Sequence, residues 1–103
     1  MDATVVDGQL VTLTGRLDVT GSGVAREALH AAIAAGAGPL VVDLAGVDLL
    51  DATGLGVLVG SHRRARSAGR SLVLRDASPR VARLLWLTRV DRIIAVERTT
   101  TAA

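Results

Sequence analysis

Alternating apolar and polar positions at the start of the chain predict two short strands, over residues 4–6 and 9–14. Asp7 and Gly8 lie between them. This pair is typical of a tight hairpin turn, because both central residues of such a turn need positive φ. The chain therefore begins with a β-hairpin.

A helical pattern follows a connection over residues 15–21. Apolar residues recur on one helical stripe up to about Ala35. We expect Ser22 or Thr20 to cap this helix, since a hydroxyl can accept a hydrogen bond from the free N–H groups of the first turn. Glycines at 36 and 38 and then Pro39 end the helix.

The rest of the chain alternates short apolar runs with helical stripes. The pattern predicts a buried strand over 40–44, a helix from near Thr53 to Gly69, a strand over 71–75, a helix that begins at Ser78-Pro79, and a last strand over 93–96. The order β-β-α-β-α-β-α-β requires right-handed crossovers into a mixed, mostly parallel sheet with helices packed on it. We expect one α/β domain over 1–103, with a core over about 4–98 and a flexible tail over 99–103.

The composition fits a single aliphatic core. The 103 residues suffice for one domain, and half of them are hydrophobic. The only aromatic residue is Trp86, so the core must be built from Val, Leu, Ile and Ala. The chain has no cysteine, no apolar run near the length that spans a bilayer, and no signal-peptide pattern at its start. These features favour a cytoplasmic protein without membrane insertion.

The charges are uneven, although the net charge is only +2. Residues 1–60 contain two arginines and seven acidic residues, whereas residues 61–103 contain ten arginines and three acidic residues. Arg63, Arg64, Arg66 and Arg70 suggest either a solvated face of one helix or a surface for an acidic partner. No aromatic residues are interleaved with them and no nucleic-acid-binding motif is present, so we expect no nucleic acid as a partner.

The residues with the most chemistry lie together in one segment, 48–56, with the sequence Asp-Leu-Leu-Asp-Ala-Thr-Gly-Leu-Gly. We place this segment in the loop between the strand over 40–44 and the next helix, where α/β sheets usually carry function. Thr53 falls at the helix N-terminus, which favours an anion. On these residues alone, ordinary helix capping by Asp51 or Thr53 explains the pattern better than a functional site does.

Other chemistries lack their required residues. An aspartyl-phosphate reading of Asp51 needs a downstream lysine, and a phosphate-binding P-loop needs one too, but the chain has no lysine. His30 and His62 have no metal ligand at suitable spacing, and no Gly-x-Ser-x-Gly nucleophile turn occurs. We therefore expect no enzyme activity, no metal and no cofactor.

The block over residues 41–58, with Asp-Ala-Thr-Gly-Leu-Gly at 51–56, resembles the signature of STAS domains, specifically the bacterial anti-sigma factor antagonists. In that family an apolar strand leads to Asp-Ser-Ser-Gly-Leu-Gly or a near variant at the start of the second helix. Two further segments are similar, the Gly-Arg-Leu-Asp that ends at Asp18 and the strand and helix over 69–85. The resemblance covers about residues 4–98.

The resemblance implies a partner-switching regulator. Unphosphorylated members bind an anti-sigma factor that is also a serine/threonine kinase of the histidine-kinase-like ATPase fold, and so release the sigma factor. The kinase phosphorylates the hydroxyl residue before Gly-Leu-Gly, here Thr53, and a phosphatase reverses the step. The implied partner-binding residues are Asp18, Asp48, Asp51, Ala52, Thr53, Gly54, Leu55 and Gly56.

The chain departs from this family pattern in three ways. Thr53 replaces the commoner serine, and Ala52 removes a second hydroxyl, so one acceptor remains. The helix that usually follows the last strand is short or absent, which could expose an apolar patch for weak self-association or for a partner. The alternative function is a constitutive STAS scaffold or adaptor, either a stressosome-like subunit or the soluble partner of a lipid or anion transporter, without regulation by phosphorylation.

Overall fold

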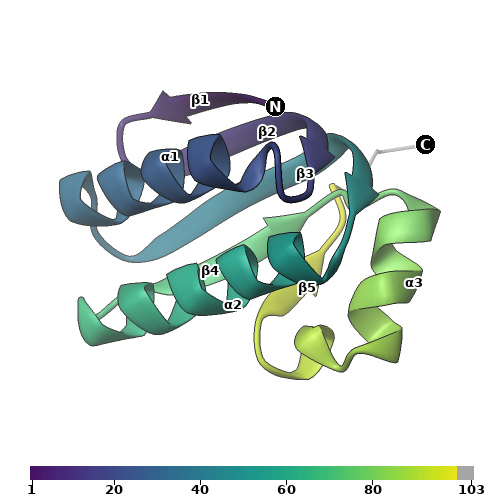
Figure 1. The fold of residues 1–103 in the computed structure, drawn as a ribbon. Coiled ribbons are helices and arrows are strands. Elements are labelled where there is room, and N and C mark those ends of the chain that lie inside the picture. The colour runs from purple at the N-terminus through teal and green to yellow at the C-terminus, as the bar shows by residue number, and fades with distance from the viewer. Residues whose placement is uncertain (100–103) are drawn as a thin grey trace.

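Five strands form one sheet in the computed structural model, which describes residues 1–99 of the chain (Figure 1). The elements in chain order are β1 (Asp2–Val6), β2 (Leu10–Leu17), α1 (Ser22–Ala35), β3 (Pro39–Leu50), α2 (Ala52–Ser67), β4 (Ser71–Arg75), α3 (Pro79–Leu87), the short 3-10 helix η1 (Val90–Arg92) and β5 (Ala95–Glu97). The predicted order of strands and α-helices is confirmed.

The strands lie side by side in their chain order. β1 pairs with β2 in the antiparallel direction, and each later pair, from β2·β3 to β4·β5, is parallel. The hairpin turn has the predicted geometry, since Asp7 and Gly8 have φ values of 53° and 62° and the Gln9 N–H donates to the Val6 carbonyl at 2.9 Å. The mixed, mostly parallel sheet is confirmed.

β3 is much longer than predicted. It extends to Leu50 instead of ending at residue 44, so Asp48 and the two leucines after it lie in a strand and not in a loop. The register with β2 shifts twice: Thr12 pairs with Asp43 but Thr14 pairs with Gly46, and a second shift separates the next pairs. Each shift inserts one extra residue on β3, as in a β-bulge. Because of these bulges, apolar and polar residues do not alternate strictly along β3, and the sequence pattern does not predict its second half.

α1 is capped differently from the prediction. Its N-cap is Gly21, without a side-chain cap bond. The Ser22 hydroxyl donates to the Val19 carbonyl at 3.2 Å, and the Thr20 hydroxyl donates to Asp18 at 2.6 Å. Neither predicted cap is used, because the carboxylate of Asp18 accepts from the turn before the helix.

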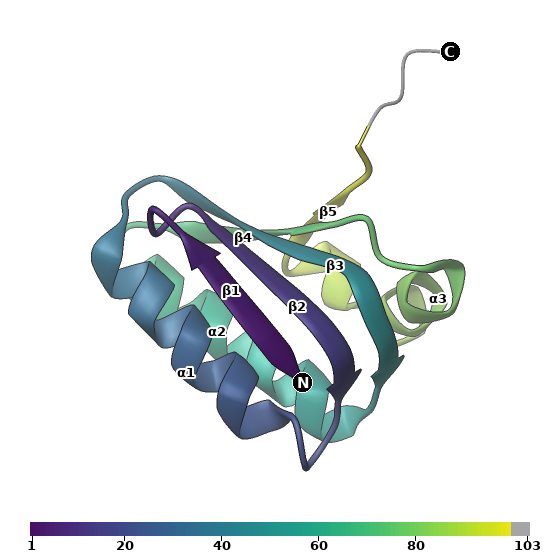
Figure 2. The ribbon, with the colours of Figure 1, turned by 90° about the horizontal axis from the view of Figure 1, so that it is seen from above.

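α1 and α2 lie next to each other over one face of the sheet (Figures 1 and 2). The face of β2 toward the core carries Val11, Leu13 and Leu17, all fully buried. The buried apolar side chains of the described residues are all aliphatic, and the single aromatic residue, Trp86, is 66% exposed. The predicted aliphatic core is therefore confirmed, and Trp86 lies outside it.

The last strand is shorter than the predicted 93–96. Arg89 adopts a left-handed conformation with φ 62° after α3, and η1 then occupies the chain up to Arg92. β5 begins only at Ala95, although Ile94 is fully buried before it. Of the predicted tail, Thr99 donates its backbone N–H to Asp76 at 2.6 Å, and residues 100–103 lie outside the described residues.

Candidate functional site

The start of α2 is fixed by the carboxylate of Asp51. This residue directly follows β3 in extended conformation and is the N-cap of the helix. Its Oδ1 accepts a hydrogen bond from the Gly54 N–H at 2.9 Å, and its carbonyl accepts from the Leu55 N–H at 2.9 Å. A carboxylate at this position satisfies a free backbone donor and complements the positive end of the helix. The predicted helix capping by Asp51 is therefore observed.

Gly54 allows the first turn of α2 to approach the end of β2. A Cβ atom at this position would lie 2.1 Å from the Leu17 carbonyl oxygen and 2.7 Å from Leu50 Cδ1. The Asp51 N–H also donates toward that carbonyl, at 3.4 Å. The glycine is therefore required by packing within the domain, and the turn is held against two neighbouring strands.

Thr53 is the exposed residue of this turn that carries a hydroxyl group. It is the second residue of α2, between exposed Ala52 and buried Gly54. The N–H groups at the start of a helix have no helical acceptors, so an oxyanion attached here would find donors nearby. Gly56, one turn later, has nothing within 4 Å of the position of a Cβ atom. The side of the turn that faces solvent thus presents one hydroxyl and an open glycine.

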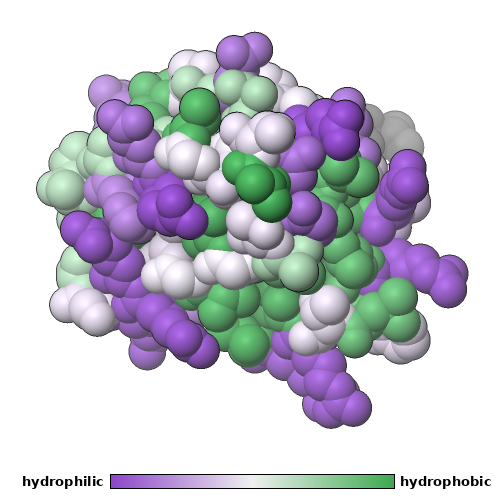
Figure 3. Space-filling model, in the orientation of Figure 1, coloured by the Kyte–Doolittle hydropathy of each residue, from purple (hydrophilic) through white to green (hydrophobic). Residues whose placement is uncertain are grey.

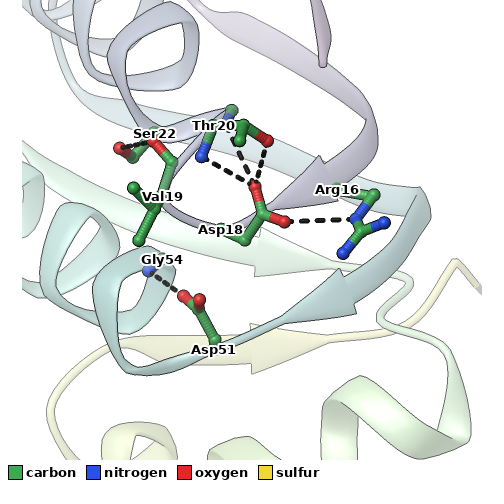
Figure 4. Close-up of polar contacts among 8 residues, drawn as sticks. Arg16, Asp18, Val19, Thr20, Ser22, Asp51 and Gly54 are labelled. Atoms are coloured by element: carbon green, nitrogen blue, oxygen red, sulfur yellow. Dashed lines mark hydrogen bonds and ion pairs between the residues drawn. The ribbon is translucent and has the colours of Figure 1, made fainter.

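Asp18 organises a second turn beside the first one (Figure 4). Its Oδ1 accepts from the Thr20 hydroxyl at 2.6 Å, the Thr20 N–H at 2.9 Å and the Gly21 N–H at 3.2 Å, while its Oδ2 contacts Arg16 Nε at 3.1 Å. The hydrogen bond from the Thr20 hydroxyl is the main cause that lowers the pKa of Asp18, and the two backbone donors and Arg16 also lower it. One carboxylate thus accepts four hydrogen bonds that tie the turn together.

The two turns are neighbours because β2 and β3 are parallel and end together, with Leu17 paired with Leu50. Val19, in the turn that Asp18 organises, is 71% exposed (Figure 4). Val19 is not among the partner-binding residues predicted from the sequence. Its place in the sequence, an apolar residue between the turn-forming residues Asp18 and Thr20, could have indicated that its side chain is exposed.

Asp48 does not join this cluster directly. It is the extra residue at the second bulge of β3, and it is exposed. It lines a separate hollow of about 410 Å³ with Arg16, Leu49 and Arg80. Arg16 lies between this hollow and the Asp18 turn, because it lines the hollow and also contacts the carboxylate of Asp18. The structure thus brings Asp18 together with residues 51–54 and leaves Asp48 beside them.

The predicted arginine surface needs a correction. Arg70 is 4% exposed and belongs to the core of the fold. Its guanidinium donates to backbone carbonyls and to the Gln9 side chain at distances from 2.6 to 3.1 Å, and the carbonyls are those of Gly8, Ala32, Ile33 and Gly38. Arg63, Arg64 and Arg66 remain exposed on α2. Spacing along the sequence could not distinguish the buried arginine from the others.

His62 also has a structural contact. Its Nδ1 accepts from the Leu72 N–H of β4 at 3.3 Å. Burial, and then the nearby Arg66, lower its pKa. Within residues 1–99 no three His, Cys, Asp or Glu side chains gather as metal ligands, and no helix there has the length and hydropathy needed to cross a bilayer.

A comparison with protein families matches residues 2–96 to the model described as "Mlab, STAS domain". The chain belongs to the STAS domain family. The match extends from β1 into β5 and includes both turns described above. The resemblance noted from the sequence is therefore confirmed.

Relatives within this family include anti-sigma factor antagonists. The anti-sigma-B factor antagonist of Bacillus subtilis (strain 168) is 37% identical over 86 residues, which cover 84% of this chain and 78% of the relative. The crystal structure of an anti-sigma factor antagonist from Mycobacterium paratuberculosis superimposes with a TM-score of 0.76 at 26% identity, covering 94% of this chain and 83% of the other. The names of both relatives describe a regulatory role, that of an antagonist of an anti-sigma factor.

A third structure shows the same fold at lower identity. The unphosphorylated form of SpoIIAA, an anti-sigma factor antagonist of Bacillus, has a TM-score of 0.76 at 20% identity, and the match covers 96% of this chain and 87% of SpoIIAA. This likeness establishes the arrangement of sheet and helices.

Proposed function

We propose that this protein is an anti-sigma factor antagonist whose binding to its partner is controlled by phosphorylation of Thr53. The observation that carries the proposal is the exposed position of Thr53 at the N-terminus of α2, on a turn fixed by the Asp51 cap and by the close approach of Gly54 to Leu17. The hydroxyl is accessible to another protein while its backbone is held in place.

The relatives support this role. The chain is similar over most of its length to the anti-sigma-B factor antagonist of Bacillus subtilis. SpoIIAA, which has the same fold, has been solved in a phosphorylated form as well as an unphosphorylated one. Regulation by one phosphate is therefore compatible with this type of domain.

The electrostatics of the turn supply the switch. A phosphate on Thr53 would add close to two negative charges, and backbone N–H groups of the first helical turn can donate to its oxygens without refolding. The same charge would lie near the carboxylates of Asp51 and Asp18. A partner surface that fits the neutral hydroxyl and the exposed Val19 is then repelled by the new charge.

The proposed partner surface consists of both turns, the adjoining part of α2 and Asp48 at the second bulge of β3. Its residues are Asp18, Asp48, Asp51, Ala52, Thr53, Gly54, Leu55 and Gly56. Gly54 acts through the position of the turn because it is buried, whereas Ala52, Thr53 and Gly56 are exposed. The proposed partner is an anti-sigma factor and kinase of the histidine-kinase-like ATPase fold, with a phosphatase for the modified form, all in the cytoplasm.

Binding measurements with three variants test this function. Thr53→Ala removes the acceptor and should bind the cognate anti-sigma factor like the unmodified protein, measured by titration calorimetry. Thr53→Ser should also bind and remain sensitive to the kinase with ATP. Thr53→Glu should bind much more weakly, because it places a permanent charge at the turn. If Thr53→Glu binds normally, the proposed switch is wrong.

A second candidate is a constitutive adaptor for a transporter. The matched family model has the name Mlab and not that of an antagonist, which favours this candidate. The adaptor would use the same two turns in a permanent interface with the ATPase subunit of a lipid transporter. A stable complex with such an ATPase that is unchanged by Thr53→Ala and Thr53→Glu would favour the adaptor over the antagonist.

Self-association remains a prediction for a different surface. Exposed apolar side chains occur around the end of α3 and before β5, at Trp86, Leu87 and Ile93. Sedimentation at increasing protein concentration, with Trp86→Ser as the variant, tests whether two copies pair there.

A further inference from the structure

A cleft lies between α1 and α2 on the side of these helices that faces solvent. Its volume is about 280 Å³. α1 contributes Arg26 and His30, and α2 contributes Gly56, Gly60, Ser61 and Arg64. Figure 3 shows hydrophilic side chains gathered over these two helices on the left of the view. Thr53 does not line this cleft, which begins one turn further along α2.

The cleft is strongly cationic. Its lining contains two arginines and a histidine and no acidic residue. Among residues 1–99, neither Arg26 nor Arg64 forms an ion pair with a carboxylate. Burial, followed by the charges of Arg64 and Arg26, lowers the pKa of His30. These neighbouring positive charges repel one another, and an anion between them would remove that repulsion.

Ser61 adds a donor that the fold does not use. Its side chain is buried, with the residue 1% exposed, and its Oγ has no hydrogen-bond partner within the described part of the chain. Buried hydroxyl groups in folded proteins almost always have a partner. Because Ser61 lines the cleft, a ligand there could accept its hydrogen bond.

The glycines keep the cleft open. Gly56 and Gly60 are one helical turn apart, and an added Cβ at either position would meet nothing within 4 Å. Glycine inside a helix lowers helix stability compared with alanine, so two of them on one face are not favoured by the helix itself. Their absent side chains leave room for a ligand beside the backbone of α2.

We propose that this cleft binds the phosphoryl group of a small ligand, either inorganic phosphate or a phosphate monoester. The guanidinium groups of Arg26 and Arg64 match the oxygens of a tetrahedral dianion, and the Ser61 hydroxyl supplies a further donor. An anion bound beside His30 favours its protonated form, so the imidazole can take up a proton from solvent and add a positive charge. The cleft shares Gly56 with the proposed partner surface but does not include Thr53, so phosphate binding here does not require modification of Thr53.

An NMR titration of the full chain tests this site. Inorganic phosphate and glycerol 3-phosphate are added in separate series, at an ionic strength held constant with sodium chloride. We expect saturable shifts of the Gly56 and Gly60 amide signals and of the His30 imidazole signals. The ligand with the lower Kd identifies free phosphate or the monoester as the preferred source.

Arg64→Gln and Arg63→Gln form the matched pair for this experiment. Both remove one charge from α2, but only Arg64 lines the cleft. Arg64→Gln should weaken binding roughly tenfold, as expected for the loss of one charge-assisted contact, while Arg63→Gln should keep the Kd of the original protein. Gly60→Leu fills the cleft and should also abolish saturable shifts, and its amide dispersion verifies that it is folded.

Three outcomes would overturn the proposal. Shifts that grow linearly with phosphate, without saturation, indicate general screening. Equal weakening by Arg63→Gln and Arg64→Gln indicates that net charge alone matters. Unchanged binding in folded Gly60→Leu places the ligand elsewhere. None of these results bears on binding of the anti-sigma factor, which is measured separately with the Thr53 variants.

Discussion

The two ends of the sheet use charged side chains in opposite ways. At the carboxyl ends of β2 and β3, Asp18 and Asp51 accept hydrogen bonds from the N–H groups of two turns. At the other end of α1, Arg70 donates to carbonyls, including those of Ala32 and Ile33 in the last turn of the helix. Each charge has the sign that suits the free groups and the dipole at its helix end.

The ends differ in what they leave exposed. The guanidinium of Arg70 is enclosed by the hairpin turn and by the end of α1, and nothing of it is offered to a partner. The aspartate turns hold their backbone just as firmly but leave Thr53 and Val19 in solvent. Rigid backbone with an exposed side chain is what a docking site requires, and only one end provides it.

The largest predicted effect is at the buried end. Arg70→Met should lower the free energy of unfolding by about 3 kcal/mol, because several buried carbonyls lose their donor together. Urea denaturation of this variant and of Arg63→Met measures the difference. Arg63 is exposed, so its substitution should stay within about 0.5 kcal/mol of the original protein.

Two glycines at the exposed end give the next largest contrast. Gly54→Ala places a Cβ atom against the Leu17 carbonyl and should destabilise the domain by about 2 kcal/mol. Gly56→Ala meets no atom and removes a flexible residue from a helix, so it should stabilise by about 0.5–1 kcal/mol. Denaturation midpoints that change in the same direction for both variants would contradict the packing described for the turn.

The helix cap gives a smaller effect. Asp51→Ala leaves the Gly54 N–H without its acceptor and should cost about 1 kcal/mol of stability. Asp51→Asn keeps an oxygen at the same place and should retain most of the stability. An equal loss in both variants would mean that the charge of Asp51, and not its hydrogen bond, fixes the start of α2.

The smallest effect is the acid response of the other turn. The pKa of Asp18 is held below its usual value of 3.8, chiefly by the Thr20 hydroxyl. A carboxylate with a lowered native pKa stabilises the fold above its unfolded pKa, and this contribution is lost as the pH falls through the native value. Carboxyl NMR titration should show the Asp18 pKa rise toward 3.8 in Thr20→Val. If the Asp18 pKa does not rise in this variant, the Thr20 hydroxyl is not the main cause of its lowered value.

Much of the fold follows from local patterns in the sequence. Asp7-Gly8 specifies the hairpin, and Ser78 caps α3 as predicted, with its Oγ accepting from the Val81 N–H at 3.3 Å. The predicted strand ends too early, at residue 44, because the two bulges of β3 break the alternation of apolar and polar residues and because Ala45-Gly46 resembles a loop. Gly46 is needed opposite Thr14, where a Cβ atom would lie 2.6 Å from the threonine methyl group. Register with a neighbouring strand cannot be derived from one strand alone.

The site was predictable only in part. The chain itself gives Asp51 and Thr53 their places at the start of a helix, while their functional roles come from the resemblance to the antagonist family. That Asp18 lies beside this turn depends on the parallel pairing of β2 with β3, which a sequence pattern does not specify. The role of Arg70 depends on contacts with residues more than 30 positions away, such as Gly38 and Gly8.

Phosphate mapping on the complex tests the central claim most directly. The protein is incubated with its cognate anti-sigma kinase and ATP, and the product is analysed by intact mass, by fragment mass spectrometry and by size-exclusion chromatography. The account predicts one added phosphate, located on Thr53, and release of the modified protein from the kinase. A phosphate on another residue, or a modified protein that stays in the complex, would contradict it.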